Sequence, residues 1–169
     1  MKIFYLHYGI KKLPDNAEVT SRKACKAVIK RNNEILLIHT NKGDYKFPGG
    51  GYKNGESLKE CLFREIMEET GYKLVNIGEL LGYVLEQNHD KYNPEKYFSM
   101  KSEYYSVEID ESRQDLQNLD DYEKDLNFKP VFIDINEAIK NNQNILKDND
   151  KDQNPWVKRE TDVLCNLIK

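Results

Sequence analysis

The sequence predicts a single domain of the α/β class. Short apolar runs typical of β-strands are interspersed with two longer segments whose apolar residues follow helical spacing. A length of 169 residues fits one domain, and 38% hydrophobic residues suffice for a core without disulfides or a structural metal. We therefore expect residues 1–169 to form one folded unit in which helices pack against a sheet.

The N-terminal part of the chain is expected to contain an extension and a β-hairpin. Residues 1–20 form the extension, with a strand in Ile3–Tyr8. Two apolar runs follow, at Ala27–Ile29 and Ile35–Ile38. The polar stretch Arg31–Glu34 between them has the composition of a hairpin turn, so the two runs are expected to pair as strands.

Residues 57–70 are predicted to be helical. Ser57 opens the segment and Glu60 stands three positions later, which is the pattern of a capping box. Gly71 occupies the position at which a glycine commonly ends a helix. A glycine-rich stretch, Phe47–Gly51, lies shortly before this helix, so the chain is expected to pass from a glycine turn into a capped helix.

The second half of the chain is expected to add three strands and a terminal helix. The strands are predicted at Leu80–Leu85, Tyr104–Ile109 and Val131–Ile135. Ile135–Asn141 is expected to begin a short helix, and the polar stretch Asn141–Asn154 to be a loop. Pro155–Ile168 has apolar pairs at helical spacing, which predicts an amphipathic helix that packs on its own domain.

The composition argues against several functional classes. The net charge of −3 gives little electrostatic reason to expect binding to nucleic acid. No apolar run approaches the roughly 20 residues of a membrane span, and the first residues lack a signal-peptide pattern, so we expect a cytoplasmic protein with no membrane partner. Three cysteines without metal-site spacing are expected to be reduced thiols: Cys25, Cys61 and Cys165.

Three glutamates of the predicted helix share one face. Because a helix advances about 100° per residue, Glu65, Glu68 and Glu69 fall within an arc of roughly 100°. Carboxylates at this spacing repel one another, at a cost of about 0.2–0.5 kcal/mol per pair. A divalent cation reverses the sign, because Mg²⁺ prefers hard oxygen ligands and keeps positions open for phosphate oxygens and water. The face therefore suits a metal site.

The residues around this face fit the same chemistry. The glycines before the helix allow close approach of the backbone and can offer a carbonyl oxygen as a ligand. Arg64 lies beside the acidic arc and can fix a carboxylate by two parallel hydrogen bonds. Three glutamates alone are better explained as a solvated helix face. Their combination with Gly50, Glu56, Arg64 and Gly71 at set spacings favours the metal site.

The segment Gly50–Tyr72 resembles the Nudix box, GX5EX7REUXEEXGU, in which U is bulky and apolar. Every fixed position matches, and Ile66 fills the first U. Tyr72 fills the second, where an aliphatic residue is more usual. The resemblance implies a Nudix-type α/β/α sandwich of helices around a mixed, curved β-sheet, with residues 50–72 as loop, helix and loop.

The resemblance also implies a hydrolase that binds Mg²⁺ or Mn²⁺. Glu56 and Arg64 would brace the site, and an activated water would attack a phosphorus of a nucleoside diphosphate linked to another group. The general base would be Glu65 or an acid of the Asp120–Asp125 loop, among which Glu123 is preferred. The implied metal ligands are the Gly49 carbonyl and the carboxylates of Glu65, Glu68 and Glu69.

Residues outside the box must select the substrate. Arg22, at the start of the first core strand, either reaches a phosphate or is an ordinary exposed cation. Tyr45 and Phe47 flank the glycine turn and are candidates for stacking on a base or ring, with core packing as an equal alternative for Phe47. Compact relatives often act on (deoxy)nucleoside triphosphates, which makes these small molecules the leading expectation.

Other interpretations stay open. Enzymes of this kind also include 5′ RNA pyrophosphohydrolases and hydrolases of ADP-ribose or dinucleoside polyphosphates. The acidic balance counts against RNA, and the soft sequence markers of the other two are not found. A Nudix-fold sensor that binds a nucleotide without cleaving it is the alternative from another class, although such domains usually lose box glutamates that are all present here. A homodimer is compatible with the resemblance.

Overall fold

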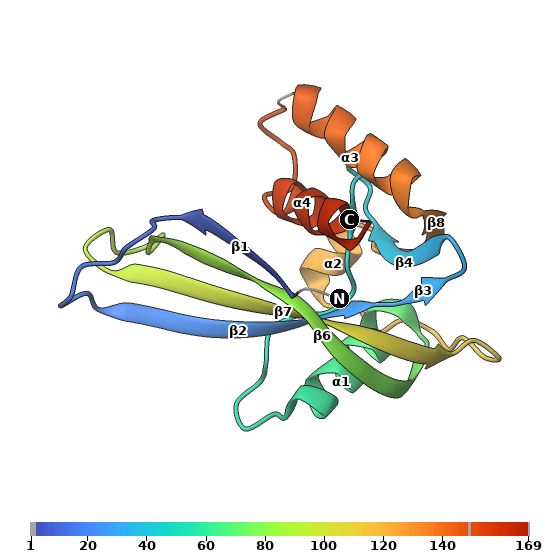
Figure 1. The fold of residues 1–169 in the computed structure, drawn as a ribbon. Helices are drawn as coiled ribbons and strands as arrows, with labels where there is room; N and C mark the ends of the chain where they lie inside the picture. The colour runs from blue at the N-terminus through green and yellow to red at the C-terminus, as the bar shows by residue number, and fades with distance from the viewer. Residues whose placement is uncertain (1–2, 149, 169) are drawn as a thin grey trace.

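The computed structural model describes residues 3–148 and 150–168 (Figure 1). The strands are β1 (Phe4–Gly9), β2 (Val19–Val28), β3 (Lys30–Arg31), β4 (Glu34–His39), β5 (Tyr45–Lys46), β6 (Lys73–His89), β7 (Tyr97–Asp110) and β8 (Lys129–Asp134). The helices are α1 (Leu58–Thr70), α2 (Asp121–Asp125), α3 (Ile135–Asp148) and α4 (Val157–Leu167). Within the described ranges, no helix is both long enough and apolar enough to cross a membrane.

Two sheets form the centre of the fold. The larger has the order β1–β6–β7–β2, in which β6 and β7 are antiparallel while β1 and β2 run parallel to their neighbours. The smaller joins β3, β4, β5 and β8 through antiparallel pairs. In Figure 1, α1 lies on one side of the strands and α3 and α4 lie on the other. This is the mixed-sheet α/β sandwich that the sequence predicts.

The core has two parts because the side chains of β2 alternate between its faces. On the side of α1, residues of β2 pack with the helix; this cluster includes Cys25, Ala27, Leu62 and Ile66. On the side of α3 and α4, a second cluster includes Val28, Phe47, Tyr104, Val163 and Leu164. Burial on both faces holds β2, and the turn beside it, between the helix layers.

Several predicted elements are confirmed. Ser57 is the N-cap of α1 and forms a reciprocal capping box with Glu60. Gly71 ends the helix in the left-handed region, at φ 75°. The predicted hairpin lies between β3 and β4, where Arg31 pairs with Glu34, whereas Ala27 and Val28 of the first predicted strand belong to β2 and pair with β7. The expected strand at Ile3–Tyr8 corresponds to β1, which lies beside β6; residues 1 and 2 of the extension lie outside the described residues.

The prediction of a loop at Asn141–Asn154 is wrong for residues 141–148, because α3 continues through them. Position 149 lies outside the described residues. Asn142 is fully buried, where a polar side chain would be expected to destabilise a helix. Its amide accepts from the Tyr45 N–H and donates to the Tyr45 carbonyl, both at 2.9 Å. These paired hydrogen bonds let a polar residue occupy the buried face of the helix.

Candidate active site

The glycine turn, residues 48–51, is hydrogen-bonded along β2 as an additional strand would be. The Ala27 N–H donates to the Pro48 carbonyl at 2.9 Å, and the Cys25 N–H donates to the Gly50 carbonyl at 3.0 Å. The Gly49 carbonyl between them instead accepts a hydrogen bond from the Lys26 ammonium. Gly49 has a φ of 124°, and a Cβ there would lie 2.2 Å from the Cys25 carbonyl oxygen. Only glycine allows this turn to lie so close to β2.

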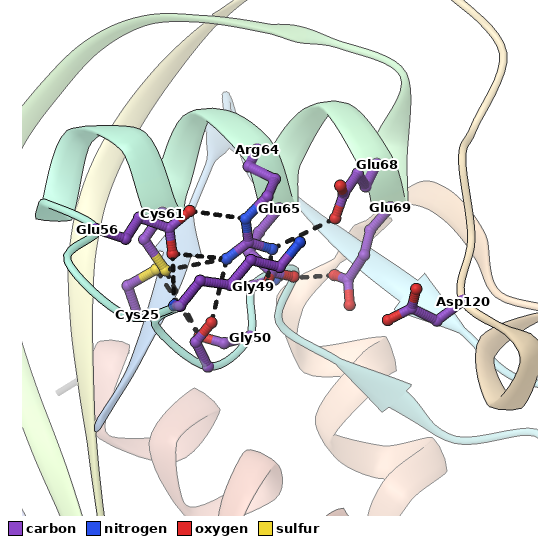
Figure 2. A network of polar contacts seen from close by, with 12 residues as sticks. Cys25, Gly49, Gly50, Glu56, Cys61, Arg64, Glu65, Glu68, Glu69 and Asp120 are labelled. Atoms are coloured by element: carbon purple, nitrogen blue, oxygen red, sulfur yellow. Dashed lines mark hydrogen bonds and ion pairs between the residues drawn. The ribbon is translucent and has the colours of Figure 1, made fainter. Parts of the chain in front are cut away.

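Arg64 connects the carboxylates of the box. Its Nε and Nη2 donate to the two oxygens of Glu56, both at 2.7 Å, as a bidentate pair (Figure 2). Its Nη1 lies between Glu65 and Glu68, 3.3 Å from the latter. The hydrogen bonds that Arg64 donates to Glu56 are the main reason that the pKa of Glu56 is lowered to about 2. Arg64 therefore orients two carboxylates of α1 and is itself oriented by Glu56.

Glu65 lies against the glycine turn. A Cβ on Gly50 would meet both Glu65 carboxylate oxygens at 2.6 Å, so the carboxylate fills the space that this glycine leaves open. The Glu65 residue is 8% exposed. Burial and the neighbouring charge of Glu69 raise the pKa of Glu65, despite the opposing effect of Arg64.

Glu69 is buried and fully engaged. One carboxylate oxygen lies 2.8 Å from the Lys46 ammonium, and the other accepts from the Gly49 N–H at 2.8 Å. The Lys46 ammonium also lies 4.3 Å from the centre of the Phe128 ring, which is a cation–π contact. Glu69 thereby ties the end of α1 to both the glycine turn and β5.

A segment after β7 wraps the end of α1. The Asp115 N–H donates to the Gly71 carbonyl at 2.8 Å, and the Asn118 N–H donates to the Glu68 carbonyl at 2.9 Å. These hydrogen bonds satisfy carbonyls that a helix end leaves free. The chain then enters α2, and Figure 2 shows the Asp120 carboxylate facing Glu69 across the site.

Glu123, the expected alternative base, is buried in α2. Its carboxylate accepts from the Asp120 N–H at 2.8 Å and from the Tyr122 hydroxyl at 3.0 Å. Burial, with a contribution from the charge of Glu69, raises the pKa of Glu123. Glu123 thus lies close enough to Glu69 for the two charges to interact.

The three residues expected to contact substrate lie in different environments. Phe47 is completely buried and packs edge-on against Tyr104, with ring centres 5.3 Å apart, so it is a core residue with no face free for a base. Tyr45 stacks on His39 at 4.7 Å and packs against the α4-side core, whereas its neighbour Lys46 contacts Glu69. Arg22 is exposed in β2.

Sequence reasoning missed Lys26 and Lys46. Both are buried, and both contact a residue expected to bind the metal. A signal was present, because Lys26 interrupts the apolar run from Ala24 to Ile29 and Lys46 directly precedes Phe47. A lone lysine in an apolar strand is more often assigned to an exposed position.

The residues of this site fit a divalent metal ion. Carboxylates and a carbonyl are the hard oxygen ligands that Mg²⁺ and Mn²⁺ prefer. Gly49 and Glu69 are already joined by a hydrogen bond, and the Glu65 carboxylate lies against the next residue of the same turn. Among the residues that the structure describes, no three acidic, His or Cys side chains are grouped as a finished metal site. The carboxylates contact cations of the protein, Arg64 in the case of Glu65 and Glu68 and Lys46 in the case of Glu69.

Comparisons with known proteins concern the family and the fold of the chain. A family model described as the NUDIX domain matches residues 20–158. An ADP-ribose pyrophosphatase of Methanocaldococcus jannaschii is 37% identical over 71 residues, and the match spans 40% of this chain and 41% of that protein. A solved NUDIX hydrolase from Nitrosomonas europaea is 18% identical, covers 89% of this chain and 91% of its own, and has a TM-score of 0.52. A MutT NUDIX hydrolase from Burkholderia pseudomallei is 21% identical over 69% of this chain and 85% of its own, with a TM-score of 0.42.

The family model extends well beyond the box. It begins in β2, along which the glycine turn lies, and ends in α4. The match therefore includes nearly all of both sheets except β1, together with α3 and the acidic face of α1, whereas most of α4 lies beyond it. The chain belongs to the Nudix family.

Proposed function

We propose that this protein hydrolyses the diphosphate linkage of a nucleoside diphosphate joined to a further group, with Mg²⁺ or Mn²⁺. One observation carries the proposal: two carboxylates of α1, those of Glu65 and Glu69, lie against a single turn that only glycine can form, and the Gly49 carbonyl of that turn can add a third oxygen ligand. Cleavage of a phosphoanhydride needs charge neutralisation and an oriented water, which such an oxygen-rich site can supply when it holds a metal.

The box residues then have distinct roles. Bound at this site, a divalent cation neutralises phosphate charge and lowers the pKa of water. Arg64 holds Glu65 and Glu68 in position, and Glu56 holds Arg64 through its bidentate pair. The residues that would hold the cation are Gly49, through its carbonyl, Glu65, Glu68 and Glu69.

We propose Glu65 as the general base, with Glu123 as the alternative. Glu65 lies directly on the glycine turn, where an attacking water would be held. Glu123 lies on the α2 side, next to Glu69 and the Tyr122 hydroxyl. Because Glu65 is also a proposed metal ligand, Glu65→Gln should lose activity in either case, so Glu123→Gln separates the two: retained turnover would leave Glu65 as the base.

Two classes of substrate are the leading candidates for this enzyme. Nucleoside triphosphates are the leading expectation for a compact enzyme of this family. ADP-ribose is supported by the partial match to a protein named ADP-ribose pyrophosphatase, which includes only two fifths of either chain. Both classes contain the same diphosphate unit, so the box alone does not distinguish them.

The test is a panel of nucleotides assayed with Mg²⁺ and with Mn²⁺, with phosphate and pyrophosphate measured separately. We expect metal-dependent turnover of at least one panel member, and a loss of orders of magnitude in Glu65→Gln and Glu68→Gln. Glu79→Gln, which changes an exposed residue of β6, is the matched control and should retain activity. Near-normal turnover in both box variants would contradict the proposal.

The same panel addresses the remaining alternatives. Faster cleavage of a 5′-triphosphorylated oligonucleotide than of free triphosphates would identify an RNA pyrophosphohydrolase. Tight nucleotide binding without metal-dependent turnover of any panel member would identify a sensor.

A further inference from the structure

Two lysines are buried among the carboxylates of the site. Lys26 lies in β2 and Lys46 lies in β5, and they are only 6% and 4% exposed. Lysine is almost never buried to this degree unless its charge is paired. The burial of these two ammonium groups must therefore be explained by the groups that they contact.

The two ammonium groups contact Glu69 and Gly49, which are hydrogen-bonded to each other. The Lys46 ammonium lies 2.8 Å from one oxygen of Glu69. The second oxygen of Glu69 accepts from the Gly49 N–H at 2.8 Å, and the Gly49 carbonyl accepts from the Lys26 ammonium. A chain of contacts thus runs from Lys46 through Glu69 and the Gly49 residue to Lys26.

These contacts use oxygens that the proposed function assigns to a metal ion. A divalent cation placed on the same oxygens would lie beside two ammonium groups, in a buried region where repulsion between like charges is strong. The two lysines already disfavour each other, since burial and then the charge of Lys46 lower the pKa of Lys26 to about 8. The lysines and a metal ion are therefore competitors for Glu69 and the Gly49 carbonyl.

We propose that Lys26 and Lys46 are resident counter-ions of the metal site, and that a divalent cation binds Glu69 and the Gly49 carbonyl by displacing both ammonium groups. This inference rests on the metal-dependent function proposed above. Other carboxylates also act on the two ammonium groups, since the charge of Glu160 raises the pKa of Lys26 and the charge of Lys46 lowers the pKa of Glu123.

The competition predicts opposite effects on two measured quantities. Lys46→Met leaves Glu69 buried without its ammonium partner, so the metal-free protein becomes less stable. The same change removes a competing positive charge, so the affinity for a divalent cation rises. A purely structural lysine would lower both quantities, because a loosened site also binds metal less well. A lysine that acts only on substrate would leave the metal affinity unchanged.

The test measures Mn²⁺ binding to the purified full chain by electron paramagnetic resonance, and melting temperature in EDTA, without a substrate in either assay. We expect Lys46→Met and Lys26→Met each to raise the Mn²⁺ affinity about tenfold or more. We expect Lys46→Met to lower the melting temperature in EDTA by at least about 5 °C. If Lys46→Met does not fold in EDTA but folds when Mn²⁺ is added, the proposal is supported; if it folds in neither condition, Lys26→Met decides.

Two controls separate competition from other effects. Lys59→Met removes an exposed charge from α1 and should change the Mn²⁺ affinity by less than about threefold. Glu69→Gln should lose Mn²⁺ affinity if Glu69 is a ligand. Binding by the wild type that neither buried-lysine variant strengthens would overturn this inference alone. Absence of Mn²⁺ binding in the wild type and in both lysine variants would overturn the proposed function as well.

Discussion

Glu160 is a buried charge on which the position of the glycine turn depends. Its carboxylate, fully buried in α4, accepts from the Phe47 N–H at 2.8 Å, the Tyr104 hydroxyl at 3.2 Å and the Arg159 Nε at 2.8 Å. Glu160→Leu would leave Arg159 with Glu86 as its remaining carboxylate and would remove the acceptor of the Phe47 N–H. Phe47 directly precedes the turn, so the change also loosens the site.

The magnitude follows from these contacts. Removal of one partner of a buried ion pair costs about 3–5 kcal/mol, and the orphaned N–H contributes within that range. We therefore expect Glu160→Leu to lower the free energy of unfolding by about 3–5 kcal/mol, against a total of about 5–15 kcal/mol for a typical domain. Glu160→Gln keeps an acceptor for Phe47 and should lose about 1–3 kcal/mol.

Urea denaturation in EDTA, followed by circular dichroism and by fluorescence of Trp156, measures these differences. The matched control is Glu137→Leu, which changes an exposed residue of α3 and should alter the free energy of unfolding by about 0.5 kcal/mol or less. A loss below about 1 kcal/mol in Glu160→Leu would refute the reasoning, because it would mean that the buried carboxylate supports neither Arg159 nor the turn.

Three further predictions concern the box. Gly50→Ala places a Cβ 2.6 Å from both oxygens of Glu65, so turnover should fall at least about tenfold while circular dichroism stays unchanged; full activity would contradict this. Ser57→Ala removes the capping box and should lower the free energy of unfolding in urea by about 1 kcal/mol. Arg64 depresses the pKa of Glu56 to about 2, so the pair's contribution is present above the ordinary pKa of 4.5 and is lost as the pH falls toward 2. The stability difference between wild type and Glu56→Gln in EDTA should therefore shrink over that window, and a pH-independent difference would exclude this role.

Structural features that depend on residues close together in the sequence were predictable from the sequence. The capping box uses Ser57 and Glu60, three positions apart, and Gly71 ends the same helix. The shared face of the three glutamates also follows from spacing within one helix. By contrast, α3 continues through Asn142, whose buried amide is satisfied by the backbone of Tyr45 in β5, far away in the sequence. Polar composition there favoured a loop, and a tertiary contact reversed the outcome.

The cations that contact the carboxylates of α1 are likewise set by tertiary contacts and not by nearby residues. The spacing in α1 shows that negative charge is concentrated, and so that some cation must offset it, but it does not identify that cation. Lys26 of β2 reaches the site because the glycine turn lies along β2. Lys46 of β5 reaches it because α1 ends beside β5. A residue pattern can therefore predict a metal site while leaving out the protein's own cations. Under the exchange proposed above, those cations set part of the free energy with which a metal ion would bind.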